Sequence, residues 1–102
     1  MIVLGDFSGR EIRLTHERLV HILRHSEMQG QEQRIGETLR APHSVILSHH
    51  DPAVHLYHRL FDETPVTRKY LVVVVKLLEH DAFIITAFFT GKEKKGVRVW
   101  PR

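Results

Sequence analysis

Imidazole side chains are the groups in this sequence best suited to proton transfer, and two of them are regularly spaced. His21 and His25 lie four positions apart in the segment HERLVHILRH, residues 16–25, which has the apolar periodicity of a helix. Four residues on a helix are about 40° apart around its axis, so the two rings would share a face. Because imidazole titrates near neutral pH, such a pair could exchange protons with a substrate. The alternative is a solvated polar face on which neither histidine has a chemical role.

Histidines four residues apart also occur in metal sites, but zinc normally takes three or four protein ligands. The segment HERLVH, residues 16–21, is one residue longer than the His-Glu-x-x-His motif of metalloproteases, so its histidines would lie about 140° apart. On the later strands, His55 and His58 would point to opposite faces of a sheet. We therefore expect no metal site and no cofactor.

A second group of polar residues lies on the predicted strands. His55, Tyr57 and Arg59 alternate with apolar residues in AVHLYHRLF, residues 53–61, so they would form one polar stripe opposite an apolar one. A cation and a phenol on a sheet face suit contacts with phosphates and bases. The alternative is the wet face of a half-covered antiparallel sheet.

Lys76 interrupts the apolar strand that includes four consecutive valines. Lysine is rarely buried without a partner, so Lys76 either extends to the end of the sheet or lines a cleft. Thr86 lies on the next predicted strand, where it can also be an ordinary strand former. A two-residue turn at His80–Asp81 would place Thr86 and Lys76 on opposite faces, whereas a three-residue turn would place them opposite each other. The sequence leaves both registers open.

The composition is that of one globular domain, residues 1–102. Hydrophobic residues make up 42% of the chain and charged residues 26%, with a formal net charge of +3 and no cysteine. The lack of cysteine excludes disulfides, thiol nucleophiles and thiolate metal ligands, and it is typical of a cytoplasmic protein. A modest positive charge permits an anionic partner. We expect no signal peptide and no membrane span, because charged residues interrupt the apolar stretch 71–90.

Turn signals and periodicity predict the elements that position these residues. We expect a hairpin at 2–4 and 11–14, helices at 16–25 and about 31–40, and strands at 44–50, 53–61, 68–78, 82–90 and 97–100. The strands 68–78 and 82–90 are apolar on both faces, as central strands are. The predicted fold is therefore α+β, with two N-terminal helices packed on one face of a four- to five-stranded antiparallel meander.

These segments, taken in order, resemble a family of small nucleases, the phage-type barnase/EndoU/colicin/RelE-like group. The resemblance covers most of the chain, from LTHERLVHILRHSE through IGETLRAPHSV and LYHRLF to KYLVVVVK, FIITAFFT and KKGVRVWP. It implies two N-terminal helices on a four-stranded antiparallel sheet. It also implies a metal-independent ribonuclease of toxin type, which cleaves tRNA or another structured RNA by attack of its 2′-OH.

Residue by residue, the resemblance identifies part of a site. The matching positions are His21, Arg24, His25, Lys76, Thr86, Lys94 and Lys95. Ser26 stands where we would expect a proline, a departure from the family pattern. The implied partners are RNA and, for a toxin, a small acidic antitoxin or immunity protein.

Metal-free RNA cleavage needs a base for the 2′-OH, an acid for the 5′-oxygen and cations for the phosphorane. The predicted catalytic set is His21, His25, Arg59, Lys76 and Thr86. The predicted RNA-binding set is Arg24, Tyr57, Lys94 and Lys95. We expect His25, Arg59 and Lys76 to converge on one concave surface beside the first helix. The alternatives are a non-catalytic RNA-binding module and a partner-docking protein on the same fold.

Overall fold

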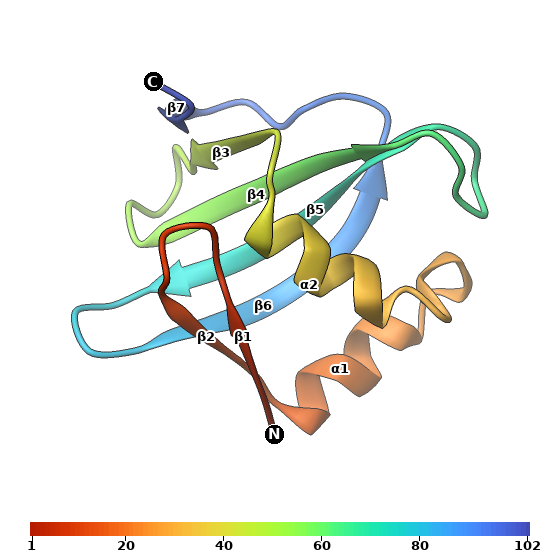
Figure 1. Cartoon of the computed structure of the whole chain (residues 1–102), viewed down its shortest axis with the longest axis horizontal. Coiled ribbons are helices and arrows are strands. Elements are labelled where there is room, and N and C mark those ends of the chain that lie inside the picture. The colour runs from red at the N-terminus through yellow and green to blue at the C-terminus, as the bar shows by residue number, and fades with distance from the viewer.

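Seven strands form one sheet, and two helices cover part of one of its faces (Figure 1). The computed structural model describes all residues from 1 to 102. The elements are β1 (Ile2–Gly5), β2 (Glu11–Leu14), α1 (His16–Leu23), η1 (Ser26–Met28), α2 (Glu32–Arg40), β3 (Ser44–Leu47), β4 (Val54–Phe61), β5 (Lys69–Leu77), β6 (Ala82–Thr90) and β7 (Val97–Trp100). The strand order is β1-β2-β6-β5-β4-β3-β7.

The prediction of a four- to five-stranded antiparallel meander is wrong. The strands β3 to β6 form a consecutive antiparallel run, but β1 and β2 extend the sheet at one edge and β7 extends it at the other. The sheet is mixed, because β2 pairs with β6 in parallel where Arg13 lies opposite Phe83. The hairpin joins the sheet because Ile12 and Leu14 of β2 are buried in the common core. Such long-range docking has no local sequence signal.

The first helix is shorter than predicted. It begins after Thr15, whose hydroxyl oxygen accepts a hydrogen bond from the backbone N–H of Arg18 at 3.2 Å, as an N-cap should. It ends at Leu23, and His25 has an extended backbone with φ −78° and ψ 121°. His21 and His25 therefore do not share a helix face, and that prediction is wrong. The second helix, α2, agrees with its predicted bounds to within one residue.

The main core lies between the helices and one face of the sheet. Ile22 of α1 and Ile35 and Leu39 of α2 are fully buried in one cluster with Val73 and Val75 of β5, with α1 packed on β6 and α2 on β5. Full burial of each such side chain contributes about 1.5–3 kcal/mol. Alternate residues of β5 point to this face. The helices therefore cover every second side chain of the strand and leave the others on the opposite face.

The connection from β6 to β7, residues 91–96, crosses the opposite face of the sheet, and we call it the strap. It must cross because β7 pairs with β3, beyond β5 and β4. The backbone N–H of Lys94 donates to Nε2 of His58 at 2.9 Å, and the Ser44 hydroxyl donates to the Glu93 carboxylate at 2.6 Å. The Lys94 ammonium also lies 5.1 Å from the centroid of the Phe88 ring.

His58 is fully buried beneath the strap, and both of its ring nitrogens have partners. Nε2 accepts the Lys94 N–H, so the proton lies on Nδ1, which is 3.0 Å from the carbonyl oxygen of Leu56. Burial is the largest influence and lowers the pKa of His58. The Leu56 carbonyl and Glu93 oppose this shift, whereas Lys94 and Arg98 add to it. His58 is therefore a neutral residue that fastens the strap.

At Gly96 the backbone of the strap lies tight against β3. A Cβ atom there would collide with the carbonyl oxygen of Leu47 and lie 2.5 Å from Cγ2 of Ile46. We expect Gly96→Ala to lower the free energy of unfolding by about 1–3 kcal/mol, because backbone cannot move aside cheaply. Urea denaturation measures this change.

The control is Gly91→Ala in the same strap, where a Cβ would meet only the mobile ammonium of Lys69 at 3.6 Å. This variant should stay within about 0.5 kcal/mol of the unmutated protein. Equal destabilisation by the two substitutions would contradict the close contact at Gly96.

Acid should weaken the fold through His58. In the unfolded chain its imidazole titrates near 6.5, but in the folded protein its pKa is lowered, so the unfolded state binds the proton first as the pH falls. The contribution of His58 to the free energy of unfolding is complete above about pH 6.5. It is lost as the pH falls from there towards the folded pKa. We expect His58→Gln to be less stable at about pH 8 but to lose less stability down to about pH 5. Urea denaturation at several pH values would show this, and an unchanged pH dependence in the variant would assign the acid loss to other groups.

Candidate functional site

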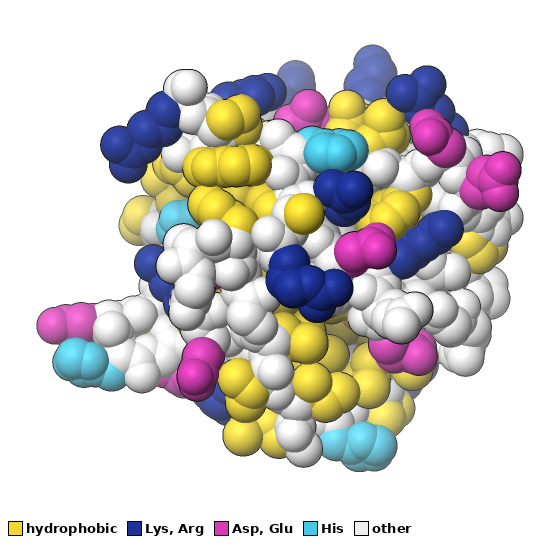
Figure 2. All heavy atoms as spheres, in the orientation of Figure 1, with side chains coloured by type: hydrophobic (Ala, Val, Ile, Leu, Met, Phe, Trp, Pro, Cys, Tyr) yellow, Lys and Arg dark blue, Asp and Glu magenta, His cyan; other side chains and the backbone are white.

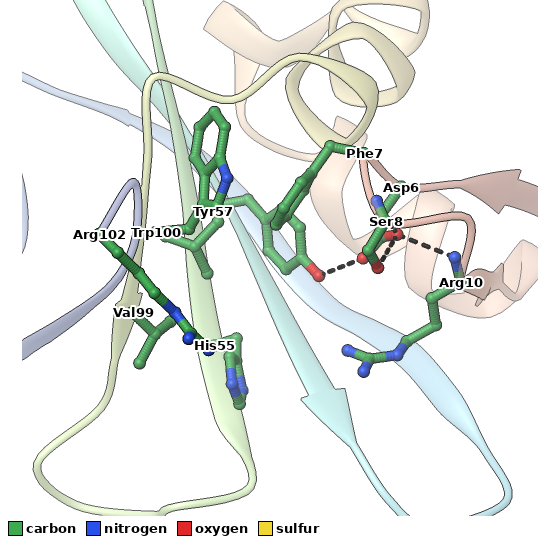
Figure 3. A pocket seen from close by; sticks show the side chains of 10 residues that line it. Asp6, Phe7, Ser8, Arg10, His55, Tyr57, Val99, Trp100 and Arg102 are labelled. Carbon is green, nitrogen blue, oxygen red and sulfur yellow. Dashed lines mark hydrogen bonds between the residues drawn. The ribbon is translucent and has the colours of Figure 1, made fainter.

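A cleft of about 230 Å³ opens on the helix side of the sheet, between the β1–β2 turn, β4 and β7. Figure 2 shows hydrophobic side chains gathered in this region, and Figure 3 shows the lining residues from close by. The helices pack over β5, β6 and part of β4, so this part of the sheet has no helix above it. The lining includes Phe7, Arg10, His55, Tyr57, Trp100 and Arg102.

A hydrogen bond between two distant segments forms the floor of the cleft. Tyr57 is 1% exposed, and its hydroxyl donates to Oδ2 of Asp6 at 2.7 Å. The other carboxylate oxygen of Asp6, Oδ1, accepts the N–H and the hydroxyl of Ser8 and the N–H of Arg10, at 2.7–2.9 Å. These bonds fix the turn between β1 and β2 above β4.

The electrostatics of this pair follow from its contacts. Burial is the largest influence on Asp6 and raises the pKa of its carboxyl, but the hydrogen bonds from Tyr57, Ser8 and Arg10 together outweigh it. The pKa of Asp6 is therefore lowered. Burial and the bond to Asp6 raise the pKa of the Tyr57 hydroxyl. Tyr57 thus stays protonated, and its hydroxyl donates a hydrogen bond to a charged carboxylate.

His55 lies beside this floor, on the same face of β4 (Figure 3). Burial is the largest influence and lowers the pKa of His55. The backbone at Ala53 opposes this shift, and the positive charge of Arg10 adds to it. The imidazole is therefore neutral at neutral pH, and its buried Nδ1 has no hydrogen-bond partner. Arg10 and Arg102 line the same cleft, and neither forms a salt bridge.

Aromatic rings form one wall of the cleft. Phe7 lies against Trp100 with ring centroids 4.7 Å apart and also meets the edge of Tyr57 at 6.1 Å. Phe7 is 38% exposed, so part of its ring is open to a ligand. Aromatic surface beside guanidinium groups suits a nucleotide, whose base stacks while its phosphate binds the cations.

The predicted catalytic set does not come together in one cleft. Arg59 lies opposite Leu71 and points to the helix side. Lys76 is five residues from Leu71 on the same strand, so it points to the opposite face. His25 follows α1 and lies on the helix side with Arg59. The predicted convergence of His25, Arg59 and Lys76 is therefore wrong.

Lys76 and Thr86 do share a face, for a reason that turn length alone does not reveal. Val75 lies opposite Ile84, but Val74 lies opposite Thr86, so β6 carries one extra residue in a bulge. Lys76 itself lies opposite Phe83, and its ammonium pairs with Asp51 at 3.1 Å. This ion pair gives Lys76 a structural partner at the end of the sheet.

The predicted RNA-binding residues are also dispersed. Tyr57 is buried, its hydroxyl is bound to Asp6, and it lines the floor of the cleft, so its contact with RNA stays a prediction. Arg24 and His21 are exposed near the end of α1, and neither lines the cleft. Lys94 and Lys95 belong to the strap on the other face.

The alternation of β4 was predicted correctly, but its orientation was not. His55, Tyr57 and Arg59 share a face as expected, yet this is the helix side, while Leu56 and Leu60 are half-buried on the other face. Sequence reasoning missed Arg10, Phe7, Trp100 and Arg102. The only sequence signal for them is composition. Phe7 and Arg10 stand together in the predicted hairpin turn, and Trp100 and Arg102 stand together after the last predicted apolar residues.

No group of three or more histidine, aspartate or glutamate side chains is placed to hold a metal ion. None of the helices is long and apolar enough to cross a membrane. No family model, curated protein or solved structure matches the chain. The resemblance to small nucleases stays a prediction.

The bond between Tyr57 and Asp6 can be tested by Tyr57→Phe. We expect a loss of about 1–3 kcal/mol in the free energy of unfolding at neutral pH, because a buried carboxylate loses a donor. The loss should shrink in acid. The pKa of Asp6 is below 3.8 in the folded protein, so its stabilising contribution is present above that value and disappears as the pH falls through the folded pKa.

The matched control is Tyr70→Phe on β5, since the Tyr70 hydroxyl forms no hydrogen bond within the protein and its ring meets the edge of His58, with ring centroids 6.2 Å apart. Urea denaturation of both variants gives the comparison. If Tyr57→Phe costs no more than Tyr70→Phe, the bond to Asp6 does not hold the turn.

Proposed function

We propose that the protein is a metal-independent ribonuclease whose site is this cleft and not the dispersed set of residues expected from sequence. One observation supports the proposal most directly. A neutral imidazole, His55, and two guanidinium groups without carboxylate partners, Arg10 and Arg102, line one cleft beside exposed aromatic surface. These are the groups that bind a phosphodiester and accept a proton.

Each group has a defined part in the proposed reaction. Arg10 and Arg102 offset the negative charge that builds up on the phosphate oxygens. His55 accepts the proton of the 2′-OH, the 2′-oxygen bonds to phosphorus, and the bond from phosphorus to the 5′-oxygen breaks. The 5′-oxygen takes a proton from water. The products are a 2′,3′-cyclic phosphate and a free 5′-OH.

A non-catalytic RNA-binding module is the second candidate, and one observation favours it. The cleft contains a single imidazole, and the raised pKa of Tyr57 makes its hydroxyl a poor acid for the leaving oxygen. Both candidates have RNA as partner, and a small acidic antitoxin or immunity protein would suit the positive charge of the same cleft. Only the ribonuclease turns RNA over.

The decisive variant is His55→Gln. We expect it to lower single-turnover cleavage of a tRNA pool in excess EDTA by about 10²–10⁴-fold while leaving RNA affinity nearly unchanged, because a general base acts in the transition state. The control is His80→Gln, whose side chain is 90% exposed on the β5–β6 turn outside the cleft. It should retain full activity.

Filter binding at several salt concentrations separates the remaining outcomes. If the unmutated protein binds RNA but cleaves none, the binding module is correct. If it neither binds nor cleaves, both candidates are wrong. Cleavage that EDTA abolishes and a divalent metal restores would contradict metal independence.

A further inference from the structure

A second pair of cations lies farther along β4, outside the cleft. Arg34 of α2 and Arg59 of β4 both face the ring of Phe61, with their guanidinium carbons 4.6 and 5.8 Å from its centroid. Neither arginine forms a salt bridge with a carboxylate. Two like charges are thus held against one aromatic ring without a counter-charge.

Both guanidinium groups are held in place but retain unused donors. Nη1 of Arg59 donates to the carbonyl oxygen of Ala41, just beyond α2, at 2.6 Å. Nη1 of Arg34 donates to the side-chain oxygen of Gln31 at 3.4 Å. The Nε of Arg59 is buried and has no acceptor. That Nε is out of reach of solvent, but Nη2 of each arginine also has no acceptor, and an anionic oxygen is the partner that a guanidinium fork prefers.

The surroundings favour an anion over a cation. Figure 2 shows Lys and Arg side chains around the position of α2, with some Asp and Glu among them. Glu37 follows Arg34 by three residues in α2, yet it pairs with neither arginine. A phosphate would supply the charge and the acceptors that no side chain supplies here.

The site also has a definite place relative to the cleft. Arg59 and His55 are four residues apart on one strand and point to the same face. A strand rises about 3.3 Å per residue, so their backbone positions are roughly 13 Å apart. Tyr57, between them on the same face, is buried beneath the β1–β2 turn, so an RNA strand with one phosphate in the cleft would pass over that turn to present another phosphate to Arg59.

We propose that Arg34 and Arg59 form a second phosphate-binding site, which holds a phosphodiester of the RNA strand whose reacting phosphate lies in the cleft. The role of RNA in this inference rests on the proposed function, but the affinity of the pair for phosphate does not. Arg59 is then a binding residue that positions the strand, and Phe61 orients both cations.

The first arm of the test uses inorganic phosphate alone. The NMR signals of the arginine Nε–H groups are followed during a phosphate titration of the full chain. We expect the Arg59 signal to shift and saturate, and the response to disappear in Arg34→Gln. Arg34 is the better variant because its one hydrogen bond is long, and circular dichroism checks its fold. An Arg59 signal that does not respond to phosphate overturns the site.

The second arm compares two RNA lengths by filter binding. Arg34→Gln should weaken binding of an oligouridylate of about eight nucleotides by about tenfold and lower its salt slope by about one, while UpU, which reaches only the cleft, binds as before. Arg18→Gln, an exposed α1 residue outside both sites, is the control. Equal weakening for the two lengths, or for the two variants, overturns the assignment to a second phosphate of RNA.

The two arms also separate this inference from the proposed function. If His55→Gln has no effect or the protein cleaves no RNA, the proposed reaction fails while the phosphate titration still supports the arginine site. If phosphate binds but the oligouridylate does not, the pair is a site for free phosphate, and the part of the inference that concerns RNA is overturned.

Discussion

The hydrogen bond from Tyr57 to Asp6 is the contact on which the cleft depends. It joins residues 51 positions apart, and it ties the β1–β2 turn to the middle of β4. The parallel contact of β2 with β6 is a single residue pair, Arg13 with Phe83, so strand pairing alone secures the hairpin weakly. The buried phenol and the charged carboxylate therefore position the turn residues, Phe7 and Arg10, that face the ligand space.

The second constraint is one of size. The helices have eight and nine residues, so they are only about 12–14 Å long. Seven strands spaced about 4.8 Å apart make a sheet roughly 29 Å wide. The helices cannot cover such a sheet, and the uncovered part of their own side becomes the cleft. The other face is crossed by the strap, which buries His58 and leaves apolar residues of β4 only half-covered.

Much of the local structure could be predicted from sequence, because local signals determine it. The N-cap at Thr15, the alternation of β4 and the long apolar strands each predict an element that is present. Three features could not be predicted. They are the parallel docking of β2, the bulge beside Thr86 and the pairing of β7 with β3. The docking of β2 and the pairing of β7 depend on which distant segment offers a complementary surface, and the bulge depends on the register between β5 and β6. Neither propensity nor periodicity carries that information.

The candidate site was the least predictable part of the structure, because its residues come from segments that only tertiary contacts bring together. His55 and Tyr57 were recognised as polar strand residues, but a period of two says only that they share a face, not which face the helices cover. Arg10 and Trp100 lie in segments whose position depends on tertiary contacts. Conversely, His21 and Lys76 have side chains suited to catalysis, but both lie outside the cleft. His21 is exposed near the end of α1, and Lys76 pairs with Asp51 on the opposite face of the sheet.

The route of the strap has a consequence for how the molecule assembles. Ser44 and Glu93, which it brings together, are 49 residues apart, so docking of the strap and β7 closes a long loop at a cost in chain entropy. Contacts of such high sequence separation form late in folding. Units at sheet edges are also among the first to open locally. Opening of β7 would remove Val99 and Trp100 from the cleft wall while the helices and central strands stay folded. Ligand access could thus be governed by fraying of one edge strand without unfolding of the domain.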